Sequence, residues 1–261
     1  MTMKRALGAV AVLIVVWLLL PTLVIIPMSF NSAASFNFPP QGFSLQWYEN
    51  FFTDPSWMRA LGSSLQVALI TMVVATSLGI MAAIGLSKVK FRGKALLESY
   101  FLTPLIVPGI VIAIGLYSLF LRFNLLGTLP GFVLAHTVVA LPLVILNVTA
   151  SLQGVDPRLE QASATLGAGR LRTFFSITLP LIMPGVTAGA LFAFVTSFDE
   201  IILSLFIQSP QLQTLPVKIY NSVTQASDPT VAAVAVVAMF TSVLVMLTAQ
   251  FATRKRKRVS A

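Results

Sequence analysis

The sequence contains no cysteine, a single histidine and only eight acidic residues among its 261 positions. Without cysteine there is no disulfide framework and no thiolate to bind a metal or act as a nucleophile. One histidine cannot build a metal site alone, and neither H-E-x-x-H nor G-x-S-x-G occurs. An intramembrane enzyme that uses metal-dependent or nucleophilic catalysis therefore lacks its parts, and we expect no metal site and no catalytic residue.

Charge of either sign is also scarce, at 10% of residues, whereas a soluble domain carries about 25%. Hydrophobic residues make up 57% of the chain, and the mean hydropathy is +0.91. Such a chain could not cover a globular surface with polar groups, which excludes an ordinary soluble enzyme and a disordered chain. The composition predicts an all-α polytopic membrane protein.

Charge-free runs locate six candidate spans, at residues 6–48, 60–87, 99–121, 123–155, 173–198 and 229–253. Each can hold the roughly 20 apolar residues that cross a bilayer as a helix. The first run is too long for one span, and the polar stretch 31–46 is predicted to be an external loop. A cleaved signal peptide is the alternative for the N-terminus, but the apolar stretch is longer than the roughly 7–15 residues of a secretory signal, which favours a retained helix. We therefore divide the chain into a first helix with its external loop (1–59), a five-helix core (60–253) that carries a cytoplasmic loop (154–180), and a basic tail (254–261).

The positive charges orient these spans. With six spans both termini lie on one side, and 14 of the 17 lysines and arginines fall on that side. The positive-inside rule makes it cytoplasmic. Basic clusters at helix ends are topology devices far more often than nucleic-acid patches, so the net charge of +9 predicts a lipid bilayer and no nucleic acid as the partner.

The loop between the fourth and fifth spans has more pattern than the others. Asp156 is a suitable N-cap, Pro157 suits the first helical position, and Gly167 suits the left-handed residue after the last turn, so a cytoplasmic helix of about three turns is predicted. Small residues at 162–164 would let another protein approach its backbone. A plain amphipathic connector that rests on the membrane is the alternative.

The same loop resembles the cytoplasmic signature of binding-protein-dependent ABC importer permeases: Glu-Ala-Ala, three residues, Gly, nine residues, Ile, one residue, Leu-Pro. The residues that match in register are Ala162, Gly167, Ile177, Leu179 and Pro180. Gln161 and Ser163 stand where Glu and the second Ala are usual, and whether Glu160 replaces the missing acid stays open. The resemblance implies that the loop docks on an ATPase, through Asp156, Glu160, Gln161, Ala162, Ser163, Leu166, Gly167, Ile177, Leu179 and Pro180.

Four further segments, 45–52, 90–94, 197–200 and 214–216, are similar to the spermidine/putrescine-type branch of these permeases. The resemblance implies an inner-membrane, multi-pass subunit of an importer for polyamines, without a cofactor. Its implied partners are separate ATPase subunits, a second permease subunit in a heterodimer, and an external substrate-binding protein. No phosphate loop is present, since Gly93-Lys94 is followed by Ala95, so ATP hydrolysis is expected in the partner. An ABC permease for another small organic solute is the alternative, and a secondary transporter is a more distant one, since no internal repeat is found.

Few polar groups lie at membrane depth. Asp199 and Glu200 interrupt an uncharged stretch near the end of the fifth span. They are expected either to attract cations at the mouth of the substrate pathway or to lie at a solvated helix end. His136 in the fourth span is expected to hydrogen-bond a neighbouring helix. Prolines and glycines are expected to bend or loosen the third and fourth spans, namely Pro104, Pro108, Gly109, Gly115 and Pro142.

Overall fold

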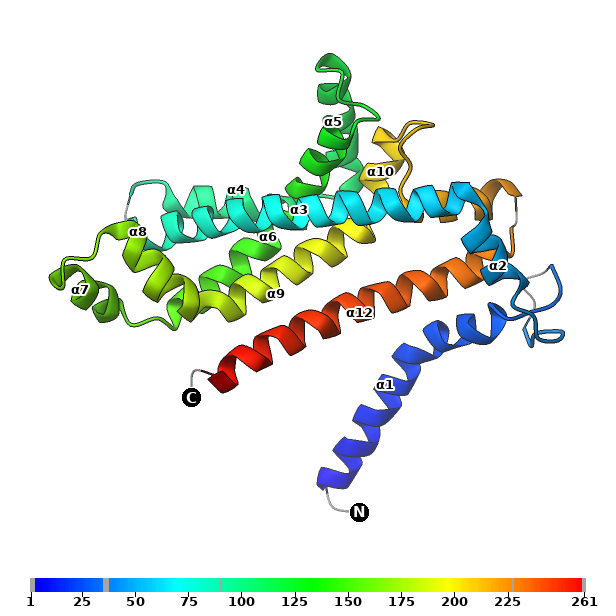
Figure 1. The fold of residues 1–261 in the computed structure, drawn as a ribbon, viewed down its shortest axis with the longest axis horizontal. Helices are drawn as coiled ribbons and strands as arrows, with labels where there is room; N and C mark the ends of the chain where they lie inside the picture. Colours follow the sequence, from blue (N-terminus) through cyan, green and yellow to red (C-terminus); the bar gives the residue numbers. More distant parts are fainter. Residues whose placement is uncertain (1–2, 35–37, 90, 227, 260–261) are drawn as a thin grey trace. The chain divides into compact units, whose positions relative to one another are not determined.

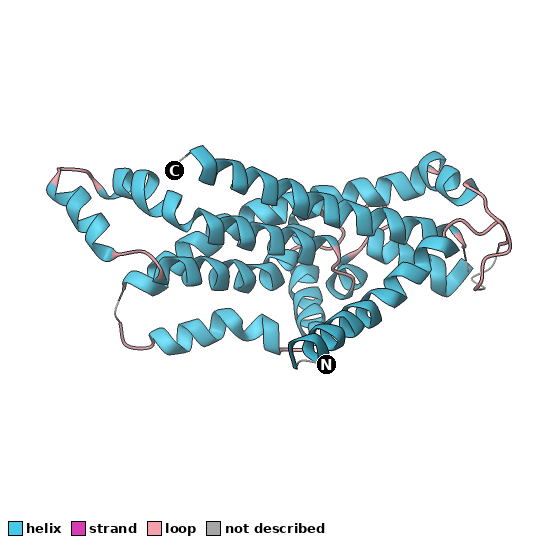
Figure 2. Cartoon of the chain, turned by 90° about the horizontal axis from the view of Figure 1, so that it is seen from below, coloured by secondary structure: helices cyan, strands magenta, loops and turns pink. Residues whose placement is uncertain are grey.

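The computed structural model describes residues 3–34, 38–89, 91–226 and 228–259. In this part of the chain the regular structure is helical, and the only β-type pairings are the isolated bridges Asn31 to Phe43 and Ser209 to Leu212 (Figure 2). The helices, with π-helical segments labelled η, are α1 (Met3–Met28), α2 (Gln46–Thr53), α3 (Pro55–Lys88), α4 (Lys94–Ile106), α5 (Gly109–Arg122), α6 (Leu129–Gln153), α7 (Pro157–Thr165), α8 (Arg170–Thr173), η1 (Phe174–Thr178), α9 (Leu179–Phe198), α10 (Ile202–Ile207), α11 (Leu215–Asn221), η2 (Ser222–Ala226) and α12 (Thr230–Val259).

Five stretches are long and apolar enough to cross a membrane, and the number rises to six if a bent pair of helices is counted as one span. The five are Leu7–Met28, Pro55–Lys88, Leu129–Gln153, Arg170–Phe198 and Thr230–Thr248. The bent pair is α4 and α5, which meet at 103°, the geometry of a broken span or of a re-entrant loop, in the segment predicted as the third span (Figure 1). The fold is thus the predicted all-α membrane protein, with a sharp bend in the segment predicted as the third span.

The break falls at Val107 and Pro108, among the residues that predicted a bend. Pro108 has no N–H, and its ring forces the preceding residue away from helical geometry. Val107 accordingly adopts an extended conformation, with φ −71° and ψ 131°. Pro104 and Pro142, in contrast, lie inside α4 and α6 without ending them.

By its contacts the chain separates into two compact units. The first comprises Met1–Arg59 and Lys218–Val243. Its short helix α2 is fixed by polar contacts: the Tyr48 hydroxyl lies 2.7 Å from Ser29 Oγ, and the Asn50 amide donates to Thr230 Oγ1 at 2.7 Å. The Lys218 ammonium lies 5.2 Å from the centre of the Trp57 ring. The side chains of the basic tail 254–261 lie outside the described part, as does Lys90.

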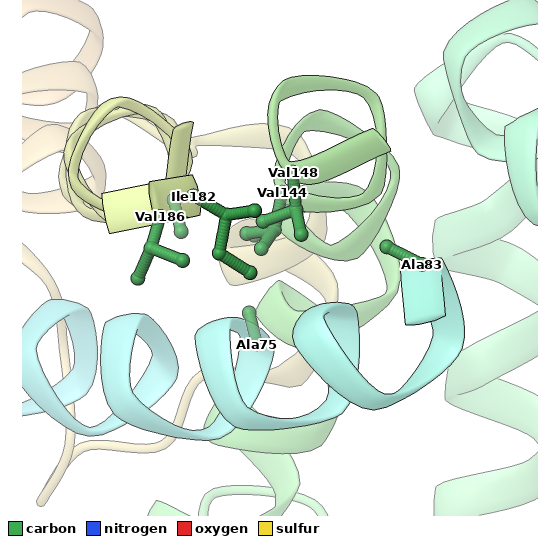
Figure 3. Packing of buried hydrophobic residues seen from close by; sticks show 8 residues of the cluster. Ala75, Ala83, Val144, Val148, Ile182 and Val186 are labelled. Carbon is green, nitrogen blue, oxygen red and sulfur yellow. The ribbon is translucent and has the colours of Figure 1, made fainter. Parts of the chain in front are cut away.

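The second unit comprises Ala60–Val217 and Leu244–Ala261. Its main core lies between α3, α6 and α9, where buried side chains from all three helices point toward one another (Figure 3). The labelled members are Ala75, Ala83, Val144, Val148, Ile182 and Val186. A second cluster joins α3, α5, α6 and α10 through Val67, Phe120, Phe132, Ala135 and Ile207.

Two glycines bring α9 very close to α6. A Cβ at Gly185 would overlap the Ser151 hydroxyl and lie 2.5 Å from the Asn147 carbonyl oxygen. A Cβ at Gly189, one turn further on, would lie 3.0 Å from Val144 Cα. This is the small-residue spacing that packs membrane helices backbone to backbone. Helices α6 and α9 therefore run side by side as a closely packed pair.

Candidate functional site

The predicted loop helix is present as α7, and its first turn is capped as the sequence indicates. The Asp156 carboxylate accepts a hydrogen bond from the Arg158 backbone N–H at 2.9 Å, and Pro157 occupies the first helical position. An N-cap carboxylate satisfies one of the backbone donors that a helix start leaves without a partner. The helix boundary is thus encoded locally.

The end of α7 is a Schellman motif. Gly167 has φ +81°, its N–H bonds the Ala164 carbonyl at 3.0 Å, and the Ala168 N–H bonds the Ser163 carbonyl at 3.1 Å. This pair of bonds requires the left-handed backbone that glycine adopts without strain. No atom lies within 4 Å of a Cβ built on Gly167, so the space beside it is open in this chain.

The inner side of α7 is attached to the rest of its unit by polar contacts, which we call the clamp: Glu160, Lys88 and Thr178. The Lys88 ammonium lies 2.6 Å from both Glu160 carboxylate oxygens. The Thr178 hydroxyl donates to Glu160 Oε1 at 2.5 Å. Beside the clamp, the buried hydroxyls of Ser163 and Thr173 are 2.9 Å apart. The clamp joins α7 to the end of α3 and to the π-helical segment η1.

The Glu160 carboxyl group has a lowered pKa. Burial pushes this pKa upward, but the hydrogen bonds from Lys88 and Thr178 and the positive charge of Lys88 outweigh that effect. Gln161, at the usual position of the signature acid, is exposed. The acid one place earlier therefore forms an ion pair within the chain.

The outer side of α7 carries an apolar stripe. Leu159, Ala162 and Leu166 are spaced three and four residues apart, which places them on one helix face. All three are exposed, and Leu166 retains 87% of its accessible surface. A helix whose inner side is clamped and whose outer side is apolar presents a surface that another protein can cover.

The other signature residues lead into α9. Ile177 belongs to η1, Leu179 packs against the α3–α6–α9 core, and Pro180 is exposed at the start of α9. The Leu179 N–H bonds the Phe174 carbonyl, five residues back. Because Pro180 has no N–H to continue the regular ladder, the π-helical segment falls where the helix is weakest. Helices α8 to α9 nonetheless form one continuous apolar stretch.

The structure separates the roles of the two candidate pathway acids. Asp199 ends α9 and is exposed, and no described residue forms a hydrogen bond or ion pair with its carboxylate. Glu200 is half-buried, and its Oε1 accepts a hydrogen bond from the Leu203 N–H at 3.0 Å, which caps α10. Asp199 is thus available to a ligand, whereas Glu200 holds the next helix.

His136 forms hydrogen bonds with neighbouring helices, as predicted. It is fully buried in α6, and its two ring nitrogens contact hydroxyl groups of α9 and α10. Sequence reasoning did not anticipate which hydroxyls these are, nor the part that Lys88 and Thr178 play at Glu160. The four-residue spacing of Gly185 and Gly189 was the one local signal that could have revealed the α6–α9 packing.

The fold resembles that of a chain in a solved transporter structure. It matches a subunit of "a bacterial ABC transporter involved in the import of the acidic polysaccharide alginate" with a TM-score of 0.73 at 15% identity, covering 99% of this chain and 98% of that one. Residues 75–259 match the family described as binding-protein-dependent transport system inner membrane component. The chain therefore belongs to this family and is an inner-membrane transport permease.

Two relatives from Escherichia coli (strain K12) are similar over most of the chain. One is the spermidine/putrescine transport system permease protein PotC, which is 33% identical over 254 residues, covering 96% of this chain and 95% of the relative. The other is the putrescine transport system permease protein PotI, which is 32% identical over 222 residues, covering 82% and 79%. The predicted family and the predicted branch resemblance are both confirmed.

Proposed function

We propose that this chain is one of two different permease subunits of an ATP-driven polyamine importer, that it receives spermidine or putrescine from an external binding protein, and that α7 docks on a separate ATPase subunit in the cytoplasm. The whole-length similarity to PotC supports the substrate class. The clamped α7, with its exposed apolar stripe, supports the docking role. The positive-inside rule supports an orientation with both termini and α7 in the cytoplasm.

The docking role carries the proposal, because it is where the energy must enter. Closure of the ATPase pair would displace α7, and its attachments to α3 and η1 would pass the displacement to the spans as rigid-body motion. Leu159, Ala162 and Leu166 would fill a hydrophobic groove of the ATPase, as an amphipathic helix does in other partner grooves.

Gly167→Val tests the docking role. A β-branched residue at φ +81° is strained, so the Schellman motif and the orientation of Leu166 should be lost. We expect ATP hydrolysis to become uncoupled from uptake, or the ATPase to dissociate. Gly169→Val is the matched control, since Gly169 has φ −67° and open space around its Cβ position. Normal transport by the Gly167 variant would show that this loop does not couple the two subunits.

Asp199 tests the substrate class. A carboxylate about 4 Å from an ammonium is worth about 4 kcal/mol at an effective dielectric of 20, enough to hold a polyamine transiently near the mouth of a pathway. We expect Asp199→Asn to lower uptake of labelled spermidine or putrescine into vesicles that contain all partners, with ATPase assembly intact. Glu200→Gln should have a smaller effect, since an amide oxygen can still accept from Leu203. Unchanged uptake by both variants would make the acids a solvated helix end, and a parent that carries only a neutral or anionic solute would exclude the polyamine branch.

A further inference from the structure

The imidazole of His136 bridges the two ends of the segment that bears the acids. Its Nδ1 lies 2.8 Å from Ser197 Oγ, in the last turn of α9. Its Nε2 lies 3.0 Å from Ser204 Oγ, in α10. Asp199 and Glu200 lie between these two serines in the sequence. We call residues 197–204 the acidic turn, and His136 is the side chain of α6 that hydrogen-bonds both of its ends.

The direction of each hydrogen bond follows from the number of protons. The Ser204 hydroxyl donates its one proton to the Glu200 carbonyl oxygen at 2.9 Å. Its oxygen must then accept from His136, so Nε2 carries the hydrogen. In a neutral ring Nδ1 is then bare and accepts from the Ser197 hydroxyl. The result is one chain of bonds from Ser197 through His136 and Ser204 to the Glu200 carbonyl.

Helix α10 depends on such attachments. With six residues, Ile202–Ile207, it is far shorter than the roughly 12–15 residues at which an isolated helix is even marginal. Its start is capped by the Glu200 carboxylate, and its apolar side packs in the cluster that contains Ile207 and Phe132. His136 supplies the polar attachment, which both fixes α10 and sets how the acidic turn leaves α9.

We propose that His136 is a positioning residue of the substrate pathway, which acts through Ser197 and Ser204 to hold the Asp199 carboxylate in its binding geometry. The inference rests on the proposed function, in which Asp199 meets the cationic substrate. His136 itself is fully buried, so it is assigned an effect through its two serine partners and no contact with the substrate. Its loss leaves the Ser197 hydroxyl without its acceptor and the Ser204 oxygen without its donor, and it lets the acidic turn adopt several geometries, of which only a fraction binds.

The test compares uptake kinetics of complete complexes reconstituted in vesicles. His136→Gln keeps polar character but cannot place a donor and an acceptor at both serines. We expect the KM for spermidine to rise about tenfold, with kcat within about twofold. A tenfold change corresponds to the net free energy of about one buried hydrogen bond. Ser204→Ala should raise KM in the same direction, and adding it to His136→Gln should change little further, since both act through one chain of bonds.

The chain offers a matched control. Thr137, the next residue of α6, is buried and its hydroxyl has no hydrogen-bond partner in the described structure. Thr137→Val therefore removes a buried hydroxyl of the same helix without breaking the acidic turn, and KM should stay at the parent value. The positioning role would be overturned if His136→Gln left KM unchanged, or if His136→Gln and Thr137→Val raised KM equally. If His136→Gln fails to assemble, Ser197→Ala and Ser204→Ala give the same comparison with a smaller change.

A spectroscopic measurement separates this inference from the proposed function. His136 is the only histidine of the chain. The difference between ¹⁵N-histidine spectra of the parent and His136→Gln complexes isolates its ring, which we expect to be the neutral Nε2–H tautomer. A Nδ1–H tautomer or an imidazolium at neutral pH would overturn the chain of bonds. A parent complex that takes up no polyamine overturns the proposed function and the substrate part of this inference. The tautomer of His136 tests the chain of hydrogen bonds on which the positioning role depends, whether or not the complex takes up polyamine.

Discussion

Neutralising Glu160 should loosen α7 from the spans, because three of its contacts depend on that carboxylate. Lys88 and Glu160 retain 44% and 25% of their side-chain surface, so the contact of 2.6 Å is open to solvent. A full Coulomb energy at this distance would be about 6 kcal/mol at a dielectric of 20, but exposed pairs measure only about 0.2–1 kcal/mol after screening and side-chain ordering. The hydrogen bond from the buried Thr178 to a charged acceptor adds about 1.5 kcal/mol or more.

Glu160→Gln removes the ion pair and leaves Thr178 with a neutral acceptor, so it should lower the free energy of local opening of α7 by about 1 kcal/mol, a factor of about 5 in the opening equilibrium. Hydrogen–deuterium exchange of the intact complex measures this directly. The backbone amides of 159–168 should exchange about fivefold faster, while those of 186–198 in α9 stay at the parent rate. Lys88→Met should accelerate exchange in α7 less than Thr178→Val does, because the contact of Lys88 with Glu160 is open to solvent whereas Thr178 is buried.

Glu98→Gln is the matched control for the loss of a carboxylate. Glu98 pairs with Lys94 at 3.8 Å, one turn apart on α4, and among the described residues its carboxylate forms no hydrogen bond or ion pair with α7. Exchange in α7 should not respond to this change. Equal exchange in the Glu160→Gln and parent complexes would refute the clamp as an energetic unit. So would independent, additive effects of Lys88→Met and Glu160→Gln, since partners in one interaction must couple.

Three other predictions concern the α6–α9 packing, the pH dependence of the clamp and the membrane topology. Gly185→Leu should prevent folding or assembly, because its side chain would overlap the Ser151 hydroxyl and the backbone of α6, and normal yield in the membrane would contradict the close α6–α9 packing. The pKa of Glu160 is lower in the folded protein than in the unfolded chain. The ionised carboxylate therefore stabilises the attachment of α7 at pH values above the unfolded-state pKa, and this stabilisation is lost as the pH falls through the folded-state pKa. Protection of α7, corrected for intrinsic exchange, should thus stay level from about pH 8 to about pH 5 and decline only below the ordinary glutamate range, with no such decline in Glu160→Gln. Cysteines at Gly42 and Ala168 should label from outside and from the cytoplasm respectively with an impermeant reagent, and the reverse pattern would invert the topology.

Local signals predicted α7 from the sequence because a helix start and stop are short-range events. Asp156, Pro157 and Gly167 each act on the backbone within a few residues of their own position, so their order along the chain is sufficient. The membrane spans could also be predicted from the sequence, since the thickness of the bilayer sets the length of the apolar stretch that each one needs. The break at Pro108 was foreseen as a bend, but its angle of 103° depends on the packing of α5 against α10 and could not be read from one proline.

The contacts that join distant segments could not be predicted. Lys88 and Glu160 are 72 residues apart, and Lys88 stands among basic residues that mark the cytoplasmic side, so no pattern distinguishes it. The different roles of Asp199 and Glu200 depend on where α10 begins, and the uncharged stretch 201–207 gives no capping signal for that start. Only once Ile202 is known to begin a helix does Glu200 become its cap.

The arrangement of the second unit shows how movement at α7 can reach the acidic turn. Helix α7 lies in the chain between α6 and the α8–η1–α9 stretch, joined by the short loops 154–156 and 166–169, so the closely packed helices α6 and α9 are the two that α7 connects. Close approach at Gly185 and Gly189 leaves no space for one of them to slide along the other. At the opposite end of the pair, His136 of α6 bonds to Ser197 of α9, so the same two helices hold the acidic turn. We infer that α6 and α9 move together as one rigid body, and that the position of Asp199 follows the position of α7 because the clamp ties α7 to η1, at the start of α9, through Thr178.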